Sequence, residues 1–87
     1  MKINKDFVLR EIAGESMLVP SGAQAQKMNG IIALNPVAAV IWKALCEKEE
    51  EQYALEKMLE TFDVTEEEAK RDLTEFLSVM QENGLMA

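Results

Sequence analysis

The sequence predicts an α+β domain in which three antiparallel strands come first and three helices follow. Two observations lead to this prediction. In the first third of the chain, short apolar runs are separated by turn residues, as in paired strands. From residue 36 onwards, apolar residues recur at spacings of three and four, as in helices with one buried face. The change between the two patterns falls within residues 29–42, where a short β-branched strand leads directly into a capped helix.

The first two strands are predicted to form a β-hairpin. Phe7 to Ile12 alternates loosely and ends at Ala13-Gly14, and a second apolar run, Met17 to Val19, ends at Pro20. The turn between the runs is short, as adjacent antiparallel strands require.

The third strand is predicted at Gly30 to Leu34, after a weakly specified loop. Because side chains alternate between the two faces of a strand, only one of Ile31 and Ile32 is expected to face the core. Leu34, next to the following helix, favours Ile32 as its neighbour on that face. The sequence alone leaves this choice open.

Each of the three helices is predicted from its apolar spacing and its ends. Asn35 is a suitable N-cap, and Pro36 suits the first helical position of a helix that reaches about Cys46. A second helix is expected over Gln52 to Phe62. Thr65 to Glu68 matches a capping box that starts the longest helix, which ends at Asn83-Gly84.

The predicted order of elements suggests a winged-helix-like architecture with the helices on one face of the sheet. With 87 residues, the chain is expected to form a single domain over residues 1–87. Trp42, spaced with other apolar residues of its helix, is expected in the core.

Composition argues against several classes of function. The net charge of −7 opposes binding to nucleic acid. No apolar run is long enough to span a membrane, and no signal peptide is evident, so a cytoplasmic protein is expected. With no histidine and one cysteine, Cys46, the chain lacks a usual nucleophile–base pair and a zinc ligand set. We therefore expect neither catalysis, nor a metal, nor a cofactor.

The strand–helix junction resembles the coenzyme PQQ synthesis protein D family, whose signature there reads roughly Leu-Asn-x-Thr-Ala-x-x-Ile-Trp-x-x-Leu. Val37 departs from it, standing where the family usually has Thr. The matching residues are Leu34, Asn35, Ala38, Ile41, Trp42 and Leu45. Further similar segments are Phe7-Val8-Leu9-Arg10, Val19-Pro20-x-Gly22, Asp72-Leu73-x-x-Phe76-Leu77 and Asn83-Gly84-Leu85.

The resemblance implies a peptide-recognition domain. Members of the family serve radical and other enzymes that modify ribosomally made peptides. The partners it implies for this chain are the leader of a precursor peptide and a modification enzyme, expected to be of the radical SAM class.

A peptide-binding site is predicted at the edge of the sheet beside the last helix. A bound segment would pair with the third strand, which has no proline or charge to block its edge. The predicted peptide-binding residues are Gly30, Ile31, Ile32, Ala33 and Leu34 in the strand and Lys70, Arg71, Thr74 and Ser78 on the helix. Arg71 could grip a carboxylate or carbonyl with its planar fork. A solvated helix face explains the four helical residues about as well.

Two other functions remain open at this point. A winged-helix DNA-binding regulator would need a basic recognition helix, whereas the last helix begins with Glu66-Glu67-Glu68. A structural subunit of an enzyme complex, with no peptide affinity of its own, is a third possibility that the sequence does not exclude. The open strand edge and the loop over residues 23–29 are compatible with a monomer or with a strand-exchanged dimer.

Overall fold

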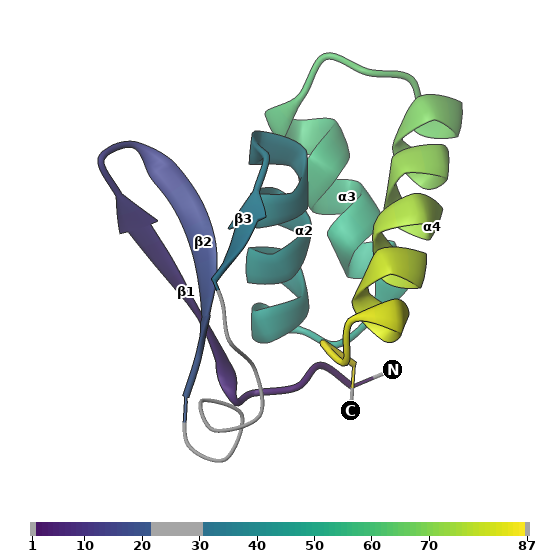
Figure 1. Cartoon of the computed structure of the whole chain (residues 1–87). Helices are drawn as coiled ribbons and strands as arrows, with labels where there is room; N and C mark the ends of the chain where they lie inside the picture. Colours follow the sequence, from purple (N-terminus) through teal and green to yellow (C-terminus); the bar gives the residue numbers. More distant parts are fainter. Residues whose placement is uncertain (1, 22–30, 87) are drawn as a thin grey trace.

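The computed structural model describes residues 2–21 and 31–86. Strands β1 (Phe7–Ile12), β2 (Glu15–Pro20) and β3 (Ile32–Leu34) precede helices α2 (Pro36–Glu47), α3 (Glu51–Thr61) and α4 (Glu66–Glu82). Figure 1 shows the sheet on one side of α2, with α3 and α4 beyond that helix. The predicted α+β class and the order of its elements are therefore confirmed.

The sheet is antiparallel throughout, in the order β1-β2-β3. Ala13 and Gly14 form the hairpin turn with positive φ angles of 53° and 81°. These values suit the two-residue turns that match the twist of paired strands.

Two strands differ in length from the prediction. Pro20 belongs to β2 although a proline was expected to end the strand, because it lies at the strand's end, opposite Phe7. β3 begins at Ile32. Gly30 and the loop that precedes it lie outside the described residues, so the prediction of a strand-exchanged dimer stays a prediction.

The helix ends follow the capping residues that the sequence predicted. The Asn35 side chain accepts a hydrogen bond from the Ala38 amide at 2.8 Å, and Pro36 occupies the first turn. The Thr65 hydroxyl accepts from the Glu68 amide at 3.1 Å. The Glu68 carboxylate accepts a hydrogen bond from that hydroxyl, and not from the backbone as the capping box predicts. At the end of α4, Gly84 has a φ of 72°.

The core lies between the sheet, α2 and the two later helices. Trp42 is 1% exposed, which confirms its predicted core position. The largest fully buried side chains are Trp42, Leu18, Ile41, Leu45, Met58, Met80 and Leu85. The two ends of the chain meet below this core, where the Asn4 amide donates to the Leu85 carbonyl at 2.7 Å (Figure 1).

Candidate functional site

The hydrogen-bonding register of the hairpin determines which backbone groups lie on the outer edge of the sheet. A two-residue turn makes Ile12 and Glu15 a hydrogen-bonded pair, and such pairs then alternate along the strands. The same alternation predicts a bond between Asp6 and Ser21. The Ser21 amide indeed donates to the Asp6 carbonyl at 2.7 Å.

It follows that Ser16 and Leu18 direct their backbone groups away from β1, toward β3. They face Leu34 and Ile32 respectively, which are therefore the hydrogen-bonded partners across β2 and β3. Ala33, between those partners, points its N–H and C=O away from the sheet. Its side chain is exposed as well. β3 is thus an edge strand with one outward-facing peptide donor and acceptor at its centre.

The side chains of this edge strand alternate between the core and solvent in the way that the sequence favoured. Ile32 and Leu34 pack against the core, and Ile31 is 55% exposed. The preference for Ile32 as the inward residue is therefore confirmed. Ile31 lies just before β3 and extends the edge with an exposed apolar side chain.

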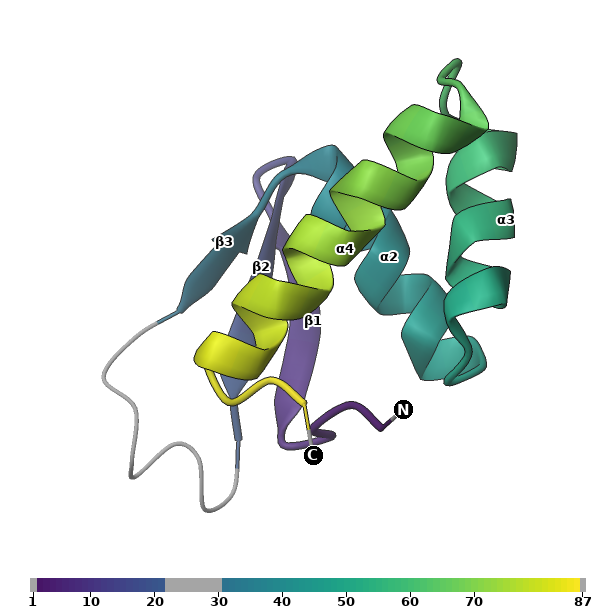
Figure 2. The ribbon, with the colours of Figure 1, turned by 90° about the vertical axis from the view of Figure 1, so that its right-hand side faces the viewer.

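A hollow of about 200 Å³ lies between α2 and α4, starting at the residue that follows β3. Ala38 and Ile41 of α2 are buried and form its floor. Its full lining is Asn35, Val37, Ala38, Ile41, Asp72, Glu75, Phe76 and Val79. Figure 2 shows β3 and α4 flanking this side of the molecule, with α2 behind them. The hollow therefore begins next to the end of β3.

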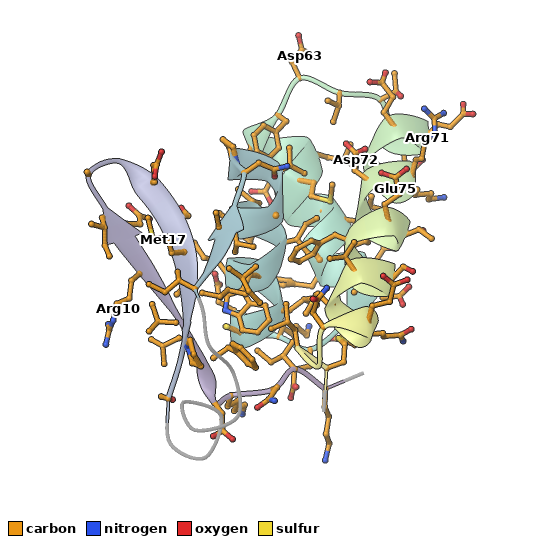
Figure 3. All side chains as sticks on the ribbon, in the orientation of Figure 1. Arg10, Met17, Asp63, Arg71, Asp72 and Glu75 are labelled. Atoms are coloured by element: carbon orange, nitrogen blue, oxygen red, sulfur yellow. The ribbon has the colours of Figure 1, made fainter. Side chains whose placement is uncertain are left out.

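The α4 residues that line this hollow differ from those predicted from sequence to contact a peptide. Lys70 and Thr74 line a different hollow, between α3 and α4. Arg71 points outward, away from the sheet, whereas Asp72 lies on the α2 side (Figure 3). Ser78 is exposed. Helical spacing identifies the polar residues of α4 outside its apolar stripe, but it does not determine which flank of that stripe faces β3.

Lys70 and Arg71 also have acidic neighbours on their own helix. The Lys70 ammonium is 3.9 Å from a Glu66 carboxylate oxygen, and the Arg71 guanidinium is 4.0 Å from one of Glu67. Such exposed pairs contribute about 0–1 kcal/mol to stability. They do, however, offset the positive charge of this part of the helix.

A larger hollow, about 610 Å³, lies at the opposite edge of the sheet, between β1 and α2. Phe7, Leu9, Trp42 and Lys43 contribute to its lining. The Lys43 ammonium is 2.9 Å from the Glu11 carboxylate, and this contact lowers the pKa of Glu11. Burial raises the pKa of the Cys46 thiol in the same hollow, which disfavours the reactive thiolate.

Within residues 2–21 and 31–86, no group of three or more potential ligand residues is placed to hold a metal ion. Across the same residues, no helix has the length and apolar character needed to cross a membrane.

An open edge strand beside a partly apolar hollow defines a small binding domain suited to an extended peptide segment. The sequence matches the family model of coenzyme PQQ synthesis protein D over residues 9–86. The chain therefore belongs to the coenzyme PQQ synthesis protein D family.

A solved structure described as TbiB1 in complex with the TbiA(beta) leader peptide has the same fold, with a TM-score of 0.80. The two proteins are 24% identical, and the match covers 99% of this chain and 94% of the other. No curated protein matches the sequence.

Proposed function

We propose that this protein is a non-catalytic peptide-binding module. It captures the leader of a ribosomally synthesised precursor peptide by strand addition to β3 and presents the peptide to a modification enzyme. The observation that carries the proposal is the outward-facing backbone of Ala33 beside the hollow between α2 and α4. Family membership supports a role in peptide recognition, and the similar fold of a protein solved with a leader peptide supports a leader as the occupant.

Strand addition accounts for both parts of the site. The outward N–H and C=O of Ala33 would pair with the peptide backbone, which provides affinity without dependence on sequence. Alternate side chains of the peptide would then face the helices. The hollow, rather than the α3 side where Lys70 and Thr74 lie, is the proposed contribution of α4. Its proposed contact residues are Asp72, Glu75, Phe76 and Val79.

The partner enzyme is proposed to belong to the radical SAM class, on the strength of the family resemblance. The module supplies binding and placement of the peptide, and the enzyme supplies the chemistry. Nothing in residues 2–21 and 31–86 favours the DNA-binding alternative. The two cations near the start of α4 lie beside glutamates, and the net charge of −7 repels phosphate.

Amide shift mapping tests this proposal. The ¹⁵N-labelled protein is titrated with the leader half of a short precursor peptide encoded beside its gene. We expect shifts at residues 31–35 and 72–79. Shifts confined to β1 and the 42–47 part of α2 would place the peptide in the opposite hollow and overturn the assignment to β3. If no leader encoded beside the gene shifts any amide, peptide capture itself is refuted.

A further inference from the structure

The hollow beside β3 combines an apolar surface with negative charge. Four of its eight lining residues, Val37, Ala38, Ile41 and Val79, are aliphatic, and Phe76 adds an aromatic ring. Val79 is 47% exposed, so it offers apolar surface that a ligand would cover. The two ionisable residues in the lining, Asp72 and Glu75, are both acidic.

These two carboxylates have no ion-pair partner in the described part of the chain. Neither forms an ion pair or a side-chain hydrogen bond there, whereas the nearby Lys70 and Arg71 lie beside Glu66 and Glu67. Asp72 is half-buried. A cation brought into the hollow would therefore meet two carboxylates that are not paired with any cation of residues 2–21 and 31–86, in surroundings less screened than open solvent.

The length of the hollow sets how many peptide side chains it can accept. Asp72 and Val79 are seven residues apart on α4, which corresponds to about 10 Å along the helix axis. Side chains on the same face of a strand repeat every two residues, or about 7 Å. Two such side chains fit along the hollow, one near Asp72 and Glu75 and the other near Phe76 and Val79.

We propose that the leader captured by this protein carries a lysine or arginine and, two positions away, a large apolar residue. The basic side chain pairs with Asp72 and Glu75, and the apolar side chain covers Phe76 and Val79. This inference rests on the proposed function, because it assumes that the leader is paired with β3. It names the chemical class of leader that the module selects.

A displayed library of random 12-residue peptides, selected on the folded protein, tests the inference. Peptides selected on the wild type should share a Lys or Arg two positions from a large apolar residue. Replacing that basic residue with Glu should weaken binding by about fivefold or more. Binding of the basic peptides should also weaken as salt is raised, because salt screens the charge pair.

A pair of charge-reversed variants provides the matched control. The double variant Asp72→Lys, Glu75→Lys should lose the basic preference and select acidic residues at that position. The double variant Glu56→Lys, Glu60→Lys makes the same change in net charge on α3, where both residues are exposed, and should keep the wild-type preference. Circular dichroism melts establish that each variant is folded before selection.

The outcomes separate this inference from the proposed function. Selected peptides that bind at β3 and are weakened by Ala33→Pro, yet show no preference for a basic residue, would overturn the charge assignment and leave peptide capture intact. The same holds if both double variants alter the preference equally. If Ala33→Pro leaves the affinity of the selected peptides unchanged, binding at β3 is refuted.

Discussion

Replacing Ala33 with proline is the most direct perturbation of the proposed peptide site. The register places the Ala33 N–H on the outer edge, so proline removes a donor that the peptide would use and that β2 does not use. The flanking pairs, Leu18 with Ile32 and Ser16 with Leu34, keep their hydrogen bonds. We therefore expect the variant to fold and to bind a leader more weakly.

The size of the effect follows from one lost hydrogen bond and the added ring. The net contribution of one hydrogen bond to the binding free energy is about 0.5–1.5 kcal/mol. The proline ring also projects toward the incoming strand. Together these predict a loss of about tenfold in affinity, or about 1.4 kcal/mol. Fluorescence anisotropy with a labelled leader peptide measures the affinity. A thermal melt establishes that the variant is folded.

Two control variants accompany the affinity measurement on Ala33→Pro. Ala33→Val keeps the donor and should bind nearly as the wild type does. Ile32→Pro removes a donor that points toward Leu18 and should lower stability by disrupting the sheet. If folded Ala33→Pro binds the leader with wild-type affinity, the peptide does not pair with this edge, and the reasoning from register to function fails.

Three further predictions concern the stability of the fold and the DNA-binding alternative. Trp42→Ala should destabilise the domain by about 3–5 kcal/mol in urea unfolding, because it removes a buried aromatic from a small core. The protein should show no measurable binding to duplex DNA in gel shifts at physiological salt, given its net charge of −7. Because Lys43 lowers the pKa of Glu11, the Glu11–Lys43 pair should stabilise the fold above the usual pKa of 4.5, and this contribution should disappear as pH falls through the lowered value.

Each of these predictions has a specific contrary result. A Trp42→Ala protein that melts within a few degrees of the wild type would contradict the core assignment. Micromolar DNA binding that weakens steeply with salt would restore the regulator hypothesis. For the pH prediction, Glu11→Gln is the comparison, and its stability difference from the wild type should shrink in acid. A difference that stays constant from neutral to acid pH would show that the ion pair does not contribute.

The sequence by itself determined the local features of this protein. The hairpin turn and the Asn35 and Thr65 caps depend on residues close together in the chain. Backbone geometry and short-range hydrogen bonds impose these features whatever the rest of the fold does. The order of strands and helices could be predicted for the same reason. Even the inward position of Ile32 followed from strand alternation once Leu34 was taken as a core residue.

Only the tertiary structure decided which flank of α4 lies beside the hollow next to β3. At about 100° per residue, Asp72, Glu75 and Val79 lie on one flank of the buried stripe that contains Leu73, whereas Lys70 and Thr74 lie on the other. Helical periodicity identifies the stripe and both flanks, but it does not determine which flank faces β3. The choice depends on how α4 packs across α2 and α3, which places one flank beside β3 and the other beside α3. That packing joins residues far apart in the chain, and so the ionisable residues that α4 contributes to the hollow next to β3 are the acidic Asp72 and Glu75 and not the basic Lys70.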